Sequence, residues 1–184
     1  MKSFLQLTIF LLVLISLPAH PDNKRPHRQN KYDAIFKNLT FENEGLTWSD
    51  VKALCIVETT NLNNDATSGK NAQGVCQVKP STFNEVVRHK NKHKYHIRNP
   101  QHNIIVAANY LEQMYDRWES VVVKEDKLKF ALASYNAGAG RIHKAVKKCN
   151  SHYFNDIKKC LPKQTTDYVN KVVVQRVLLD MSSI

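Results

Sequence analysis

The sequence has no apolar run long enough to cross a lipid bilayer. Its longest run, residues 4–17, falls short of the roughly 20 residues that span the hydrocarbon core. Lys2 precedes this run, and Pro18 and Ala19 follow it. This order is typical of a secretory signal peptide; we expect cleavage after Ala19, with retention as a membrane anchor as the alternative. A cleaved leader over residues 1–19 predicts a periplasmic or secreted protein without a stable membrane span.

Cysteine is scarce as well. The four cysteines include no Cys-x-x-Cys pair, so their spacing does not predict a structural zinc site. The histidine-rich run at residues 88–98 contains no cysteine or carboxylate that would complete a metal shell. We therefore predict neither a metal nor another cofactor. In an exported protein four cysteines favour two disulfides, for which three pairings exist; four reduced, buried thiols are the alternative.

Acidic residues are few beside basic ones. Lys and Arg total 27 against 16 Asp and Glu, which gives a formal net charge of +11. Such an excess favours a polyanionic neighbour, namely nucleic acid, an anionic membrane surface or an acidic cell wall. An exported protein meets the wall and the membrane, so no nucleic-acid partner is predicted. We interpret the densest basic run, residues 88–98, as a solvated surface loop.

The remaining pattern is mainly helical, with no internal repeat. Apolar spacing and capping residues predict helices near residues 32–39, 47–58, 81–88, 100–118, 126–136, 140–148 and 165–179. Residues 61–73 are rich in Asn, Ser, Thr and Gly and predict a loop that leads into a small β-hairpin near residues 75–78. The fold class is thus a mainly α single domain with at most a small β element. It comprises a basic N-terminal segment with the first helix at residues 20–46, and the main domain at 47–184.

One carboxylate is placed as a general acid would be. Glu58 follows the apolar residues 53–57 at the end of a predicted helix. Burial there disfavours the charged carboxylate and raises its pKa toward the range that a general acid needs, whereas a solvated helix-end glutamate is the alternative. Asp65 is the nearest second carboxylate, but its Asn-rich loop favours a solvated or turn-forming side chain.

Four short blocks of sequence follow one another in a characteristic order. They are Glu58-Thr59, Gly74-Val75-Cys76-Gln77 with Pro80 and Thr82 after it, Ser134-Tyr135-Asn136-Ala137-Gly138, and Tyr168-Val169. The series resembles the catalytic domain of the soluble lytic transglycosylases, relatives of goose-type lysozyme that cleave the glycan strands of peptidoglycan. The resemblance covers about residues 47–177. Thr59 stands where that family usually has Ser, Cys76 replaces Met, and Ser134 replaces Ala.

The resemblance implies a lysozyme-like fold and a reaction that needs one carboxylate. Glu58 would protonate the glycosidic oxygen and then accept a proton from the C6 hydroxyl of the same sugar. That hydroxyl would attack the anomeric carbon in place of water and leave a 1,6-anhydro-N-acetylmuramic end. Thr59 and Gln77 would hydrogen-bond the substrate or steady Glu58. Tyr135 and Asn136 would form the facing wall, and Tyr168 would donate a hydrogen bond near the acid or the muramyl acetamido group.

The same site suggests how the cysteines pair. Cys55 lies one helical turn before Glu58, and Cys76 immediately precedes Gln77, so the two cysteines should be close if Glu58 and Gln77 line one cleft. Cys149 and Cys160 bracket a short polar segment and would close a local loop. We therefore expect a Cys55 to Cys76 disulfide and a Cys149 to Cys160 disulfide.

Three functions compete at this point. The favoured one is an exported peptidoglycan lytic transglycosylase that acts as a monomer on glycan strands, with a secretion or conjugation apparatus as a candidate partner. The second is a goose-type-like lysozyme, which hydrolyses the same bond with water. The third is a non-catalytic wall-binding accessory of a secretion apparatus. A desolvated Glu58 favours an enzyme, because a binding module has no need of one.

Overall fold

A computed structural model describes residues 30–88 and 94–182 of the chain. The predicted signal peptide lies outside these residues, as do residues 20–29 of the basic N-terminal segment and His89 and His93 of the basic run.

The described part of the chain is mainly helical, as predicted. The α-helices are α2 (Asp33–Lys37), α3 (Trp48–Glu58), α4 (Pro80–Val87), α5 (Pro100–Asp116), α6 (Lys127–Ala137), α7 (Ala139–Cys149), α8 (Phe154–Ile157) and α9 (Lys163–Met181). Two 3₁₀ turns complete the list, η2 (Lys124–Asp126) and η3 (Lys158–Cys160). In place of the predicted hairpin, the described residues contain two isolated antiparallel bridges, Thr67 with Gln73 and Gln73 with Val78.

Helix α3 sets the position of the candidate acid. It begins after Thr47, whose backbone N–H and hydroxyl both donate to the Asp50 carboxylate, at 2.8 and 2.9 Å. This bond from the third helical residue back to the N-cap backbone fixes where the first turn starts. The helix packs against α9, α2 and α5, and its residues from Ser49 to Ile56 are buried. Glu58 is its last residue, so a buried helix delivers this carboxylate to a fixed place.

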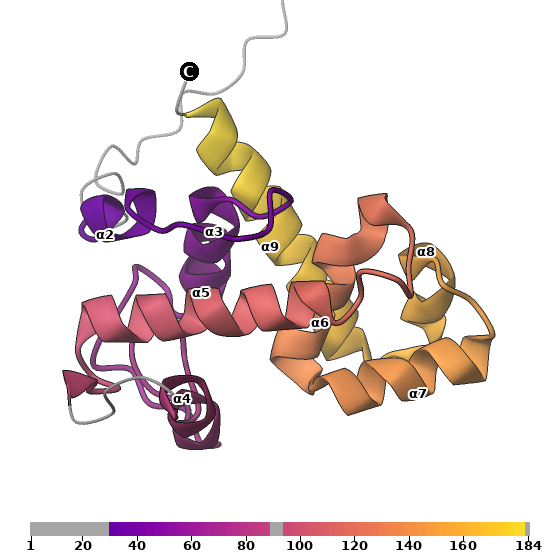
Figure 1. Cartoon of the computed structure of the whole chain (residues 1–184), viewed down its shortest axis with the longest axis horizontal. Coiled ribbons are helices and arrows are strands. Elements are labelled where there is room, and N and C mark those ends of the chain that lie inside the picture. Colours follow the sequence, from indigo (N-terminus) through magenta and orange to yellow (C-terminus); the bar gives the residue numbers. More distant parts are fainter. Residues whose placement is uncertain (1–29, 89–93, 183–184) are drawn as a thin grey trace, which may run out of the picture.

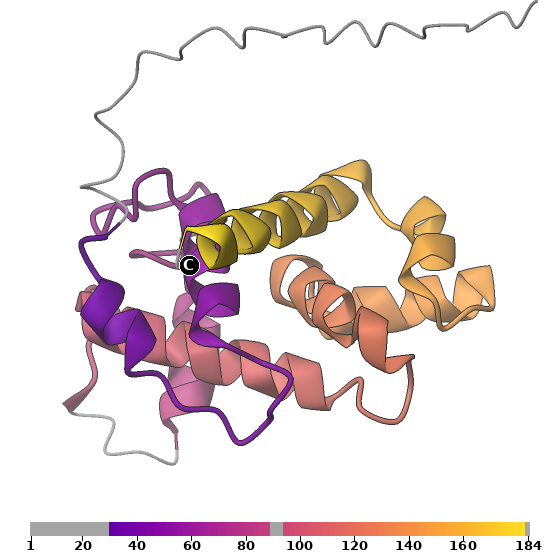
Figure 2. The same ribbon diagram turned by 90° about the horizontal axis from the view of Figure 1, so that it is seen from above.

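Helix α6 is the centre of the arrangement. It packs against α5, α7 and α9. Figures 1 and 2 show α9 running from the α3 side of the molecule to the α8 side, while α4 and the loop before it lie on the opposite side from α7 and α8. The residues between α3 and α4 therefore face the α6–α7 junction, with which they share one cleft.

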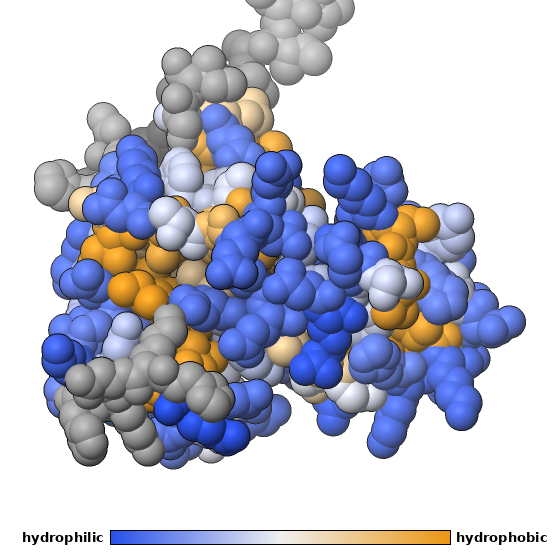
Figure 3. Space-filling view, in the orientation of Figure 1, coloured by the Kyte–Doolittle hydropathy of each residue, from blue (hydrophilic) through white to orange (hydrophobic). Residues whose placement is uncertain are grey.

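Hydrophilic side chains cover most of the face in Figure 3, with apolar side chains in smaller areas between them.

A buried tryptophan packs against α6 and donates a hydrogen bond to it. Trp118 is fully buried and its ring lies 5.0 Å from that of Phe130, centroid to centroid. Its indole N–H donates to the hydroxyl of Ser134 at 2.9 Å. A buried indole N–H needs an acceptor, and an alanine at 134 would supply none. The departure of Ser134 from the family pattern therefore has a local structural reason.

Both expected disulfides are present in the structure. Cys55 of α3 is joined to Cys76 of the following loop, with 4.2 Å between the Cα atoms. Cys149 at the end of α7 is joined to Cys160 in η3, with a Cα separation of 6.2 Å. Each closed loop is short, and a bridge of this kind contributes about 3 kcal/mol by restricting the unfolded chain. The first bridge ties the loop that carries Gln77 to the helix that carries Glu58.

Candidate active site

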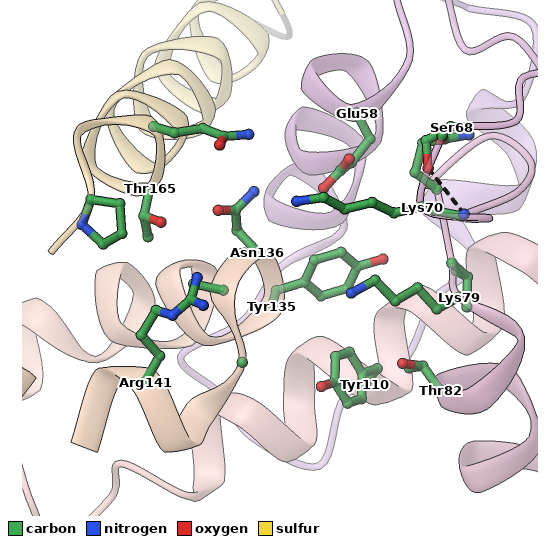
Figure 4. A pocket seen from close by; sticks show the side chains of 18 residues that line it. Glu58, Ser68, Lys70, Lys79, Thr82, Tyr110, Tyr135, Asn136, Arg141 and Thr165 are labelled. Atoms are coloured by element: carbon green, nitrogen blue, oxygen red, sulfur yellow. Dashed lines mark hydrogen bonds between the residues drawn. The ribbon is translucent and has the colours of Figure 1, made fainter. Parts of the chain in front are cut away.

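A cleft of about 610 Å³ opens beside the end of α3. Its lining comes from α3, the loop before α4, the start of α4, α5, the α6–α7 junction and the start of α9. The residues are Glu58, Ser68, Gly69, Lys70, Ala72, Gln77, Val78, Lys79, Thr82, Tyr110, Tyr135, Asn136, Ala137, Gly138, Arg141, Pro162, Gln164 and Thr165. Figure 4 shows Glu58 entering the cavity from the side opposite Tyr135 and Asn136. Four of the six residues predicted for catalysis and substrate binding thus line one cleft: Glu58, Gln77, Tyr135 and Asn136.

Glu58 is a desolvated acid. Burial is the main cause that raises its pKa from 4.5 to about 7. The Tyr168 hydroxyl and the charge of Lys79 act in the opposite direction but are outweighed. The carboxylate also lies at the C-terminal end of α3, where the helix dipole disfavours a negative charge. Near neutral pH this group can therefore both hold a proton to give and accept one back.

Tyr168 is close to the Glu58 carboxyl but does not line the cleft. It is buried, and among the described residues no acceptor or donor meets both the distance and the angle of a hydrogen bond to its hydroxyl. It is nevertheless close enough to Glu58 to lower the pKa of that carboxyl. Burial first, and the charge of Glu58 second, hold the pKa of Tyr168 well above its usual range. The hydroxyl therefore stays protonated and is placed to donate toward an ionised Glu58.

Tyr135 keeps part of its surface in the cleft while its hydroxyl is anchored. The hydroxyl donates to the carbonyl of Cys76 at 3.0 Å. Enough protein surrounds it that burial raises its pKa well above the usual range. Asn136 follows it at the end of α6, and Figure 4 shows its side chain pointing into the cavity. The turn to α7 occurs at Gly138, whose φ of 86° favours glycine.

Gln77 is held by its own loop. Its backbone has φ 47°, and its side-chain N–H donates to the carbonyls of Ala66 and Gly74, each at 3.1 Å. These two bonds use the amide nitrogen and leave the amide oxygen as its acceptor for other groups. Gln77 is therefore fixed in place before any ligand arrives.

Thr59 does not take the place expected for a substrate contact. It is buried outside the cleft lining, and its hydroxyl donates to the carbonyl of Val75 at 2.6 Å and lies 3.3 Å from that of Cys55. The hydroxyl is thus committed to holding the loop against α3. The added methyl group of threonine, compared with serine, lies among buried atoms rather than against a ligand. Only the second expected role, steadying the surroundings of Glu58, fits this position.

The family profile described as "Transglycosylase SLT domain" matches residues 38–157, which is more than half of the chain. The chain belongs to this family. Membrane-bound lytic murein transglycosylase F of Shewanella pealeana is 31% identical over 146 residues, covering 77% of this chain and 28% of that protein. The chain thus spans less than a third of the length of that relative.

Solved structures show the same fold. The 70 kDa soluble lytic transglycosylase of Escherichia coli matches with a TM-score of 0.67 and 24% identity, covering 80% of this SLT domain chain and 24% of the other. A complex of the 70 kDa soluble lytic transglycosylase with bulgecin A matches with a TM-score of 0.70 and 22% identity, covering 85% of this chain and 25% of that one. The predicted lysozyme-like helical fold is confirmed.

One positioning residue of this SLT domain was not singled out from the sequence. Asn103 of α5 is fully buried and accepts a hydrogen bond from the Cys76 backbone N–H at 2.9 Å. Its amide N–H groups donate to the carbonyls of Gln73 and Ile97, at 2.9 and 2.8 Å. A side chain on Gly74 would clash with it, since a Cβ there would lie 2.6 Å from the Asn103 Nδ2. Asn103 therefore shapes the loop that carries Gln77.

The cationic side chains of the cleft were not predicted from the sequence. Lys70, Lys79 and Arg141 line it, and Arg141 stands three residues after Gly138 in the third sequence block, where its proximity to the site could have been noticed. Asp65, the alternative carboxylate, is exposed and does not line the cleft.

Residues 30–88 and 94–182 contain neither a candidate metal site nor a candidate membrane-spanning helix. No group of three His, Cys, Asp or Glu side chains in those ranges is arranged to hold a metal ion. Within the same ranges no helix has the length and apolar character needed to cross a membrane.

Proposed function

We propose that this SLT domain cleaves the glycan strands of peptidoglycan as a lytic transglycosylase. Glu58 acts first as acid and then as base, and the product is a 1,6-anhydro-N-acetylmuramic end. Family membership supports the substrate class, and the related protein from Shewanella pealeana is named as a murein transglycosylase. The protein would work in the periplasm or outside the cell, where an oxidising environment allows its two disulfides.

The single observation that carries the proposal is the desolvated Glu58 in the cleft. A carboxyl with a pKa of about 7 is partly protonated at neutral pH, so it can donate to a glycosidic oxygen. Once it has donated, the same group is an adequate base. The Tyr168 hydroxyl, which has no full hydrogen bond among the described residues, would stabilise the carboxylate between the two steps.

The composition of the cleft favours a nucleophile that belongs to the substrate. Two-carboxylate glycosidases place a second Asp or Glu within several ångströms of the acid. Among the described residues that line this cleft, Glu58 is the only carboxylate. An attack by the C6 hydroxyl needs no second carboxylate and benefits from a nucleophile already held on the sugar.

The surrounding residues receive roles from their positions. Gln77 would accept a hydrogen bond from the sugar through its amide oxygen, because its nitrogen is already used by the loop. Asn136 would contact the sugar from the wall opposite Glu58, and the Tyr135 ring would contact the sugar from the same wall. Thr59 acts as a positioning residue behind the acid.

The test is the mass of the products from purified sacculi. The parent protein should release fragments whose muramic ends are one water lighter than reducing ends, and Glu58→Gln should release them at least 10² times more slowly. Reducing ends would indicate a goose-type-like lysozyme instead. The absence of any product from the parent would indicate a wall-binding accessory. A monomeric state and a secretion or conjugation apparatus as partner stay predictions.

A further inference from the structure

The charges in the cleft are strongly unequal. Of the charged side chains that line it, Lys70, Lys79 and Arg141 are cations and Glu58 is the only anion. None of the three cations forms an ion pair with another residue in the described ranges. Elsewhere the fold does pair its lysines, as between Lys163 and Asp167 at 2.6 Å.

The three cations stand on two walls. Lys70 belongs to the loop between α3 and α4, and Lys79 is the residue immediately before α4. Arg141 lies in the first turn of α7 on the other wall. Figure 4 shows Lys70 and Lys79 extending into the cavity from one side and Arg141 standing on the other. The charge of Lys79 acts on Glu58 itself. A ligand that fills the cleft would therefore meet positive charge on both sides of the acid.

Unpaired cations in a hollow attract an anionic ligand more than they would on a flat surface. Low-dielectric walls focus the potential of such charges into the cleft. A neutral oligosaccharide gains nothing from this potential, whereas a carboxylate-bearing one gains at each contact. Peptidoglycan strands carry carboxylates on alternate sugars, either on the lactyl ether or, where a peptide is attached, on that peptide.

We propose that Lys70, Lys79 and Arg141 form a carboxylate-binding set that selects glycan strands by the charge of their N-acetylmuramic residues. The inference rests on the proposed function for the identity of the glycan. It concerns the binding of ligand carboxylates, whereas the proposed function concerns the reaction at Glu58, so the two can fail separately. The set does not include the densest basic run of the sequence, because none of its described residues lines the cleft.

The experiment measures binding to the Glu58→Gln protein, which should not consume the ligand. The first ligand is a peptide-free strand oligomer with free lactyl carboxylates, and the second is the same oligomer with those carboxylates converted to methylamides. We expect the free acid to bind about tenfold more tightly. Replacing any one of the three cations by Gln should weaken the free acid about two- to fivefold, the range typical of a partly exposed ion pair, and should leave the amide unchanged. The triple replacement should abolish the preference.

A matched control removes the same charge from elsewhere. Lys147, Lys158 and Lys159 are exposed and do not line the cleft, so their triple replacement by Gln should preserve the preference. A cleft triple variant that still prefers the free acid tenfold would overturn the inference, as would equal loss in the control. A third ligand, the peptide-bearing oligomer, identifies the source. A loss shared by this ligand and the bare strand assigns the contact to both kinds of carboxylate, and a loss confined to the bare strand assigns it to lactyl groups. A loss confined to the peptide-bearing ligand would overturn the inference.

The outcomes separate this inference from the proposed function. Retained preference in a protein that cleaves no sacculi would leave the carboxylate set intact and remove the enzyme. Cleavage with anhydro ends but no preference for the free acid would retain the enzyme and remove the set.

Discussion

The hydroxyl of Tyr135 donates to the carbonyl of Cys76 across 3.0 Å and so connects the end of α6 to the loop on the other side of the cleft. Cys76 is in turn bonded to Cys55, one helical turn before Glu58. The wall that faces the acid and the helix that carries it are therefore joined through one residue.

Tyr135→Phe should lower the free energy of unfolding by about 1 kcal/mol, because it removes one hydrogen bond and leaves the Cys76 carbonyl without that donor. Denaturant unfolding followed by circular dichroism measures the loss. Tyr153→Phe is the matched control, since Tyr153 is 56% exposed and its hydroxyl makes no hydrogen bond among the described residues. Equal stability of the two variants would show that the Tyr135 bond contributes nothing.

Glu58→Gln should stabilise the protein at high pH. The folded state holds the pKa near 7 against 4.5 for the free side chain, so the folded form binds the proton more tightly than the unfolded form. The contribution of the protonated Glu58 to the free energy of unfolding is fully present below pH 4.5 and is lost as the pH rises to 7. Above that window the parent protein has a penalty of up to about 3 kcal/mol that the amide lacks.

Thermal unfolding at pH 4 and pH 8 checks this stability prediction. The melting temperatures of parent and Glu58→Gln should be close at pH 4 and differ at pH 8, with the variant higher. Glu44→Gln, at an exposed position, should not show the difference. A variant that is less stable than the parent at pH 8 would contradict a desolvated Glu58.

Lys79→Met should move the pH dependence of cleavage upward. The cation lowers the pKa of Glu58, so its removal raises that pKa, and the acid form persists to higher pH. The fall in kcat/KM on the alkaline side, measured on a short soluble glycan, should shift in that direction. Lys79→Arg keeps the charge and should keep the parent profile. A profile that moves downward, or that moves equally in Lys79→Arg, would argue against the electrostatic link.

Asn103→Ala should be the most destabilising of these changes. It leaves the buried Cys76 N–H and the carbonyl of Ile97 without their partner, whereas the Gln73 carbonyl keeps the Val78 N–H. Each unsatisfied group costs about 1 to 3 kcal/mol, so we expect a loss of roughly 2 kcal/mol or more. Equilibrium unfolding measures it, with Asn84→Ala at an exposed position of α4 as the control. A loss as small as that of the control would mean that the loop is held by other contacts.

Most of the helical framework was predictable from the sequence because it depends on local patterns. The two candidate caps, Thr47 and Ser49, and the apolar spacing after them located α3, for which the structure has Thr47 as the cap. The predicted helices agree with the observed ones within a few residues. Helix α8 was missed because it has four residues, too few to show a period. The hairpin reduces to isolated bridges, because the loop is held instead by side-chain bonds such as those of Asn103.

The site was predictable in part for a related reason. Glu58 stands out because apolar neighbours in the sequence are also its neighbours in space. The role of Asn103 depends on partners 27 and 30 residues away, and sequence spacing does not reveal such contacts. The cations Lys70 and Lys79 counted only toward the total charge, because the path of their loop, with Gln77 at φ 47°, decides where they point. The assignment of roles to Gln77, Asn136 and Tyr168, and the domain boundary at residue 47, stay predictions.

The most direct test of the account is digestion of sacculi in water enriched in oxygen-18, followed by mass analysis of every new muramic end. The account predicts 1,6-anhydro ends without label, because the C6 hydroxyl and not water attacks the anomeric carbon. Asp65→Asn should give the same products at the parent rate, and Glu58→Gln should give almost none. Reducing ends that carry one oxygen-18 would contradict it, since only a hydrolase that uses solvent water as its nucleophile would produce them.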